Sequence, residues 1–324
     1  MDLALYFTFF PKVVSGPLVR YCDFNTQINN RSHTVEKFSK GIELIIIGLI
    51  KKVIIADTLG ALVDSIFIDL SYGIDVSTAW LGAICYMLQI YFDFSGYSDC
   101  AIGISSCFGF DFKDNFNFPY ISKSITEFWR RWHISLGDWF KNYLYIPLGG
   151  SRTGNVYFNL FVVFMATGIW HGASWNFILW GLINAIVIVI EKRIWNTKFY
   201  KKIPNIIKWA FTMFVVFFNW ILFRADNLKV AIDYIKTMFG IKTFENIEFT
   251  LWYYLDNKIL FLIIVGFIGS TILGKIVYEK LWTKYLDENK IGYILKMTVL
   301  FILMIVAFMF MINSTYSPFI YFRF

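Results

Sequence analysis

Six long apolar runs dominate the chain, and shorter polar segments separate them. The runs occupy residues 42–56, 79–110, 156–190, 209–223, 260–277 and 294–312. A helix that crosses a bilayer needs roughly 20 predominantly apolar residues, and several of these runs approach or exceed that length. The pattern predicts an all-α, polytopic membrane protein. We treat residues 1–324 as a single membrane domain.

Two basic segments flank the run at residues 156–190. The first, at residues 113–152, contains Arg130, Arg131 and Lys141, and the second, at residues 193–208, is also rich in Lys. Loops rich in Lys and Arg are retained on the cytoplasmic side of a membrane. Both ends of the run are therefore expected on that side, so the run enters the membrane and returns.

The centre of the same run is interrupted at residues 168–173, Gly-Ile-Trp-His-Gly-Ala. The two limbs of about 13 and 17 residues would reach about 20 to 26 Å, less than a hydrocarbon core of about 30 Å. This predicts a re-entrant hairpin whose tip lies inside the membrane. Irregular backbone at that depth must be covered by protein or line a polar cavity. We therefore expect His171 to face a cavity.

An amphipathic helix is expected between the spans, lying at the membrane interface. Ser124 and Glu127 have the spacing of a capping box, and Pro147 with the glycines after it marks an end. At helical spacing one face carries Trp129, Trp132, His133, Leu136 and Phe140.

Composition agrees with the membrane interpretation and narrows the chemistry. Of the 324 residues, 57% are hydrophobic and 16% are charged, against about 45–50% and 25% in soluble domains. The net charge of +7 comes with no long basic tract or zinc pattern, so nucleic acid is not an expected partner. The four cysteines lack the close spacing of a metal site, and we expect neither a bound metal nor a disulfide framework.

Two of the three histidines occur in membrane or interfacial contexts, and they are the candidates for chemistry. A neutral imidazole in a buried cavity can act as a general base toward a hydroxyl, so His171 is the first candidate and His133 the second. The alternative is a structural histidine that bonds backbone between helices. His33 lies in a polar loop and is expected to be solvated.

The apolar run at residues 79–110 contains polar side chains, among them Asp93, Ser95, Tyr97 and Asp99. A carboxylate at the bilayer centre costs roughly 2.5–3.5 kcal/mol, so it must be paired or face water. The side chains could form a cavity wall or contact a substrate. The interpretation that we favour is that the aspartates are tied to Arg or to backbone and hold helices together.

Basic side chains within the predicted amphipathic helix and just after it could attract an anionic donor. Arg130, Arg131, Arg152 and the turn at residues 149–151 could bind a nucleotide or a phosphopantetheine carrier, or could be ordinary anchors to lipid headgroups, and we weight the anchor more heavily. The turn lacks the Lys-Ser/Thr pair of a phosphate-binding loop.

Seven stretches of the sequence together resemble the membrane-bound O-acyltransferase family, in particular its bacterial branch that acetylates alginate. In order they are residues 9–20, 88–99, 115–120, 127–136, 145–150, 170–177 and 319–324. The resemblance implies a ring of tilted transmembrane and re-entrant helices around a central tunnel. It also implies that His171 is the catalytic base and that His133 is the second functional histidine.

The resemblance further implies the substrates and partners. The donor would be a cytoplasmic acyl thioester, acetyl-CoA or an acyl carrier, with no bound cofactor. The acceptor would be a hydroxyl of an extracytoplasmic polysaccharide, reached through an acetyl-relay protein outside the bilayer. The tunnel and its substrate contacts would include Trp170, Asp93, Ser95, Tyr97, Asp99, Trp129, Arg130 and Arg131.

Family members carry further spans ahead of the stretch at residues 9–20, so we expect a chain shortened at its N-terminus, in the cytoplasmic membrane. A related branch transfers D-alanine to teichoic acid, and the tract at residues 145–150 favours O-acetylation over that alternative. Two other classes stay open. A transporter would use the intramembrane Asp and His as a proton relay, and an assembly component would need neither histidine.

Overall fold

The computed structural model describes residues 1–13, 16–245, 247 and 249–313. Every regular element in this part of the chain is a helix, apart from an isolated bridge between Ile74 and Phe249. The predicted all-α class is therefore confirmed. The ring around a central tunnel stays a prediction. Of the seven family stretches, residues 319–324 lie outside the described part, as do Val14 and Ser15 within the first stretch.

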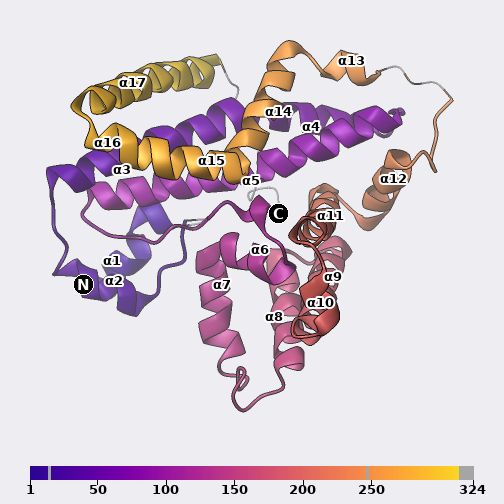
Figure 1. Cartoon of the computed structure of the whole chain (residues 1–324), viewed down its shortest axis with the longest axis horizontal. Helices are drawn as coiled ribbons and strands as arrows, with labels where there is room; N and C mark the ends of the chain where they lie inside the picture. The colour runs from indigo at the N-terminus through magenta and orange to yellow at the C-terminus, as the bar shows by residue number, and fades with distance from the viewer. Residues whose placement is uncertain (14–15, 246, 248, 314–324) are drawn as a thin grey trace.

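The first two apolar runs form two long antiparallel helices that lie side by side (Figure 1). α3 (Val35–Leu49) continues through the π-helical segment η2 (Ile50–Ala56) into α4 (Asp57–Asp69), and α5 spans Val76–Cys107. The first helix extends beyond the expected 42–56 at both ends. Three short helices precede it: α1 (Asp2–Thr8), η1 (Phe10–Lys12) and α2 (Tyr21–Ile28).

Glycines at a spacing of seven bring α3 and α5 into backbone contact. A Cβ added to Gly48 would lie 2.5 Å from the carbonyl oxygen of Gly96, and one added to Gly41 would lie 2.6 Å from that of Gly103. Small residues at such a crossing let two membrane helices approach closely, and close packing is the main attraction between helices in lipid. The two glycine pairs therefore define the register of this helix pair.

We expect Gly48→Ala to destabilise the protein by about 1–3 kcal/mol, the usual cost of overpacking. The added Cβ meets backbone atoms of α5, which cannot rotate away. Gly269→Ala is the matched control, because its Cβ would meet the Phe92 ring at 3.4 Å, an ordinary contact. Thermal unfolding in detergent measures both variants. Equal midpoints for the two would contradict the crossing.

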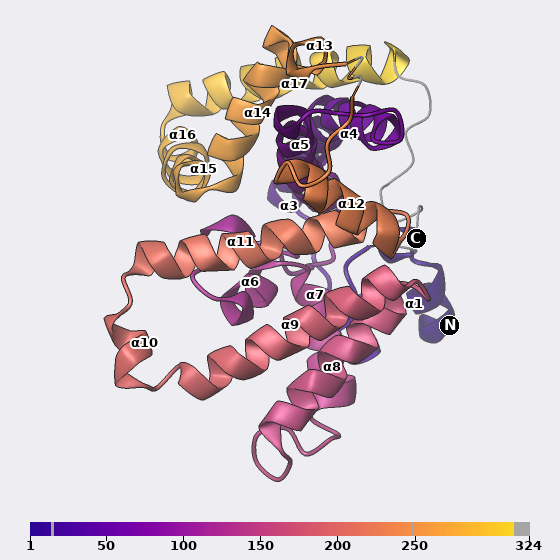
Figure 2. The ribbon, with the colours of Figure 1, turned by 90° about the vertical axis from the view of Figure 1, so that its right-hand side faces the viewer.

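A second group of helices carries the candidate histidines. Figure 1 shows α7 (Ile134–Phe140) and α8 (Val156–His171) side by side below α6 (Ile125–Arg131), joined at the lower end by η4 (Lys141–Tyr145) and a turn. Figure 2 shows α9 (Trp175–Ile194) packed along α8, with the short α10 (Lys198–Lys202) leading to α11 (Asn205–Arg224). η3 (Pro119–Ile121) precedes α6.

The prediction of one continuous amphipathic helix after Ser124 is wrong. Ser124 does cap the start, accepting a hydrogen bond from the Glu127 backbone at 2.9 Å. The helix is interrupted at His133, whose φ of +47° is left-handed. The backbone on either side of His133 bonds instead to residues 115–117, through Ile134 N–H to the Asn115 carbonyl and Asn117 N–H to the Arg131 carbonyl, both at 2.9 Å. These tertiary bonds replace helical ones.

The hairpin at residues 156–190 is present, but its break is shorter than predicted. α8 continues to His171, and only residues 172–174 separate it from α9. α8 has 16 residues and measures about 24 Å, whereas α9 has 20 residues and measures about 30 Å, the thickness of a hydrocarbon core. The apolar part of α9, residues 175–190, is close to the predicted limb of about 17 residues, and the helix continues through the charged residues 191–193 to Ile194. The position of the tip in the membrane stays a prediction.

The remaining helices pack beside α3, α4 and α5 (Figures 1 and 2). Within the described residues, α11 and the last helix are long and apolar enough to cross a membrane, and a third span is possible if two helices bent by 64° form one. The elements are α12 (Leu228–Met238), α13 (Leu251–Tyr254), α14 (Asn257–Ser270), α15 (Ile272–Ile276), η5 (Val277–Tyr285), α16 (Leu286–Glu288) and α17 (Lys290–Asn313).

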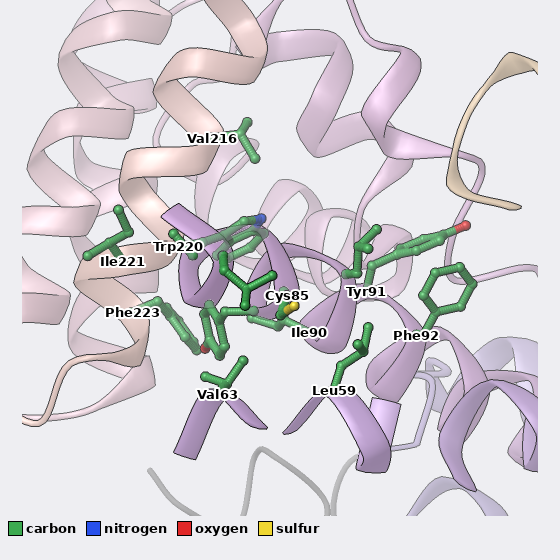
Figure 3. Close-up of a cluster of buried hydrophobic side chains, with 14 of the residues drawn as sticks. Leu59, Val63, Cys85, Ile90, Tyr91, Phe92, Val216, Trp220, Ile221 and Phe223 are labelled. Carbon is green, nitrogen blue, oxygen red and sulfur yellow. The ribbon is translucent and has the colours of Figure 1, made fainter. Parts of the chain in front are cut away.

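The main apolar core joins the two groups of helices. Figure 3 shows Val63 of α4 and Cys85 of α5 gathered in one buried cluster with Trp220 and Phe223 of α11. Trp220 and Phe223 are buried. They also form part of the wall described next, so the core fixes one side of the candidate site.

Candidate active site

A cavity of about 530 Å³ lies among α6, α7, η4, α8, α9 and α11. One face of α8 lines it from end to end, with side chains three or four positions apart. They are Val156, Leu160, Val163, Phe164, Thr167 and His171. Fifteen positions of helix correspond to about 22 Å, so the cavity is long and mostly apolar along this wall.

His171 lies at the hairpin end of this wall. It is the last residue of α8 and is buried, 8% exposed. Its ring meets those of Trp180 and Phe223 edge to face, at centroid distances of 5.2 and 5.1 Å. A Cβ on the next residue, Gly172, would lie 2.9 Å from the Phe177 ring, so a glycine is required where the chain turns past that ring. The hairpin thus fixes the position of His171.

His133 lines the same cavity from the junction of α6 and α7. It is 5% exposed, and its ring packs edge to face against Phe94 at 4.6 Å. Its Nδ1 atom lies 3.2 Å from Oδ1 of Asn115. The structure therefore brings both candidate histidines to one cavity, although they lie 38 positions apart in the chain (171 − 133).

Polar side chains of α9 hold α6 in place above the cavity. The Glu191 carboxylate accepts hydrogen bonds from the backbone N–H groups of Ile125 and Thr126, at 2.6 and 3.0 Å, and so caps the first turn of α6. Trp129, which lines the cavity, donates from Nε1 to Oδ1 of Asn184 at 3.0 Å. These bonds position the segment that leads to His133.

Charge is distributed unevenly around the cavity. Its lining includes Arg130, Lys141 and Lys192 but only one carboxylate, Asp138. Because α8 and α9 run antiparallel from the hairpin, Lys192 in the last turn of α9 lies away from the His171 end. Lys141 likewise precedes the turn that leads into α8. One end is therefore cationic, and the other holds the histidine among aromatic rings.

Other residues predicted for the site lie outside this cavity. Trp170 is 53% exposed, and Arg131 is bound to Glu127 at 2.9 Å and to the Asn117 carbonyl at 3.1 Å. Ser95 is buried within α5, and Tyr97 donates to the Val13 carbonyl at 3.4 Å. None of these four side chains lines the cavity.

The two aspartates of α5 are tied to lysines and also lie outside the cavity. Asp93 lies 3.0 Å from Lys52, and Asp99 lies 2.6 Å from Lys51. Both lysines belong to η2, so the pairs link η2 to α5. This arrangement is the helix-holding alternative favoured from the sequence, with Lys in place of the expected Arg.

Several lining or supporting residues were missed from the sequence. Asn115, Trp180 and Phe223 contact the histidines, and Lys141 and Lys192 add charge. Asn115 is the first residue of the family stretch at residues 115–120, and this motif is the signal in the sequence that could have pointed to it. The two lysines had no signal beyond their basic loops.

Comparison with known proteins places this site in a family. The sequence model of the membrane-bound O-acyltransferase family matches residues 1–225, which include every residue that lines the cavity. The chain belongs to the membrane-bound O-acyltransferase family. The predicted resemblance is thereby confirmed.

Three relatives show which proteins the chain is similar to. A probable alginate O-acetylase of Pseudomonas aeruginosa is 45% identical over 247 residues, 76% of this chain and 47% of the relative. A peptidoglycan O-acetyltransferase of Helicobacter pylori is 36% identical across 100% of this chain and 64% of its own length. A teichoic acid D-alanyltransferase of Bacillus subtilis is 34% identical over 62% of this chain and 54% of its own length. The chain thus spans about half to two thirds of these relatives.

Proposed function

We propose that the chain transfers an acyl group, in particular acetyl, from a thioester to a hydroxyl of a polysaccharide, with His171 as the general base. The observation that carries this proposal is the shared cavity of His133 and His171. A buried imidazole with a lone pair is suited to take the proton of a hydroxyl as it attacks a carbonyl. The similarity to polysaccharide O-acetylating relatives supports the choice of acetyl.

In the proposed transfer step, every bond formed and broken and the proton that moves can be assigned to the acceptor, the thioester and His171. The acceptor oxygen forms an ester bond to the acyl carbonyl carbon, and the carbon–sulfur bond of the thioester breaks. His171 takes the hydroxyl proton and returns it to the departing thiolate. His133 orients donor or acceptor from the junction of α6 and α7.

The donor that fits the cationic end is a thioester on an arm that carries phosphate, such as acetyl-CoA or an acyl carrier. Arg130, Lys141 and Lys192 would attract its phosphate, and the apolar wall of α8 would take the arm. The chain's own residues thus supply binding, orientation and a base. Arg131 is excluded from this role here because Glu127 and Asn117 hold it.

The acceptor proposed is a glycan outside the cytoplasmic membrane, approached directly or through a relay protein that carries the acetyl group. The chain would lie in that membrane as a multi-pass protein, and its apolar helices are compatible with this location. Transfer of D-alanine to teichoic acid is the second candidate, because a relative with that name is 34% identical. The higher identity of the alginate relatives favours acetyl.

Membrane vesicles that contain the chain test the function. We expect labelled acetyl from acetyl-CoA or an acetyl carrier to become alkali-labile ester on added glycan, because oxygen esters are hydrolysed by base. Free acetate is the matched control and should give no label. Movement of a solute across the vesicles without any thioester, with no ester formed, would instead support the transporter and contradict the proposal.

A further inference from the structure

The carboxamide of Asn115 occupies the point where α5, α7 and His133 meet. The side chain is 1% exposed. Its Oδ1 atom lies 3.1 Å from the backbone nitrogen of Ser135, 2.9 Å from the Ser135 hydroxyl and 3.2 Å from Nδ1 of His133. Its Nδ2 atom donates to the Ser98 hydroxyl at 3.0 Å. Both ends of the carboxamide are therefore engaged.

The orientation of this carboxamide follows from its partners. A backbone N–H can only donate, so the atom of Asn115 that faces Ser135 N–H must be the oxygen. A flipped carboxamide would direct its NH₂ group at that N–H and lose the bond. The bond from Nδ2 to Ser98 agrees with the same orientation. The oxygen therefore faces His133.

The orientation of Asn115 in turn decides which nitrogen of His133 carries the hydrogen. A carbonyl oxygen 3.2 Å away can accept but cannot donate, so Nδ1 must carry the hydrogen to bond it. The competing arrangement has the Ser135 hydroxyl donating to a bare Nδ1. That contact is 3.5 Å, against 2.9 Å from the same hydroxyl to Asn115, so the geometry favours Asn115 as its acceptor. Nε2 is then left with the lone pair.

Backbone bonds keep Asn115 and His133 in register. The Asn115 carbonyl accepts from Ile134 N–H, and Asn117 N–H donates to the Arg131 carbonyl, so the segment that carries Asn115 is bonded on both sides of His133. These bonds also hold the left-handed backbone of His133, which a non-glycine residue rarely adopts. The contact between the two side chains is thus built into the fold.

We propose that Asn115 is a positioning residue that holds His133 in the tautomer with hydrogen on Nδ1, so that Nε2 is free to accept a hydrogen bond or proton from a substrate in the cavity. The tautomer assignment stands on the hydrogen bonds alone. Its effect on transfer rests on the proposed function.

The tautomer can be measured directly in the unmodified protein. The chain has three histidines, so ¹⁵N-histidine labelling in lipid bilayers gives few signals, and ¹⁵N shifts distinguish ring nitrogens with and without hydrogen. His33→Gln and His133→Gln assign the signals. We expect hydrogen on Nδ1 of His133. Hydrogen on Nε2 would overturn the proposal, and this result does not depend on any acyl transfer.

Two variants of Asn115 distinguish its positioning of His133 from a contribution to the stability of the fold. Asn115→Leu removes the acceptor at similar size, and we expect the hydrogen of His133 to redistribute toward Nε2. Asn115→Asp keeps an acceptor and is expected to retain hydrogen on Nδ1. An unchanged tautomer in folded Asn115→Leu would overturn the assignment. If that variant fails to fold, the ¹⁵N measurement on the unmodified protein still decides which tautomer His133 adopts.

Transfer activity provides the second readout. We expect Asn115→Leu to lower the transfer rate about 10- to 100-fold, the loss seen when partners that orient metal-bound histidines are removed. Asn115→Asp should recover most of it. A confirmed tautomer with no transfer in the unmodified protein would count against the proposed function alone. Full activity in Asn115→Leu would overturn the positioning role.

Discussion

Replacing His171 with glutamine is expected to lower acyl transfer by about 10²–10⁴-fold, the usual contribution of a general base. Glutamine approximates the size of the ring and can still form hydrogen bonds, but it cannot take a proton at neutral pH. His171 is held by packing against Trp180 and Phe223, so the shape of the site should survive the change. The measurement is the rate of ester formation on glycan per amount of folded protein in membranes.

His33→Gln is the matched control for that experiment. His33 is exposed and lies outside the cavity, so its loss should leave the rate within about twofold. Membrane insertion of each variant is checked by its yield in the membrane fraction. A His171→Gln protein that inserts normally and transfers at the rate of His33→Gln would contradict the role of His171 as the base.

The sequence predicted the helical class and the position of the candidate histidine His171 near the hairpin turn, because both depend on local patterns. An apolar run with basic flanks and a break containing Gly172 was enough to predict a hairpin with His171 near its turn. The prediction erred by a few residues because Trp170 and His171 continue the helix until Gly172. Apolar periodicity does not locate a helix end when the side chains after the break are also apolar.

The break at His133 could not be predicted, because its cause lies elsewhere in the chain. The pattern from Trp129 to Phe140 is helical, and local propensity offers no reason to stop. Residues 115–117 form the hydrogen bonds that divide it. This division gives His133 its own backbone geometry and brings it to Asn115. A candidate functional position here departs from the locally preferred structure, as is common at functional sites.

The partners of the two aspartates of α5 could not be predicted from a local pattern either. A carboxylate in an apolar run indicates that a partner exists, but it does not identify the partner. Lys51 and Lys52 lie more than 40 positions from Asp93 and Asp99, at the end of a run that was itself predicted as a span. Their meeting depends on the glycine crossing of α3 and α5, which fixes the register of the two helices.

Removing the charge of Lys52 is expected to cost about 3–5 kcal/mol of folding free energy, as in other buried ion pairs that lose one partner. Lys52 lies 3.0 Å from Asp93, whose side chain is 3% exposed, and it also pairs with Asp57. In Lys52→Met the Asp93 carboxylate remains buried but no longer has the Lys52 ammonium group beside it. Unfolding in detergent measures the loss. Lys275→Met is the control, because its pair with Glu279 is 3.7 Å long and partly exposed, and we expect less than about 1 kcal/mol.

The double variant Lys52→Met/Asp93→Leu decides what the pair is for. Replacing both members of a buried ion pair with apolar side chains can be neutral, so the double variant should be more stable than Lys52→Met alone. Because Asp93 does not line the cavity of His133 and His171, the refolded double variant should also retain transfer activity. Recovered stability with lost activity would assign Asp93 to the substrate path. Recovery of both would assign the pair to holding η2 against α5, since a proton relay could not survive the loss of both titratable groups.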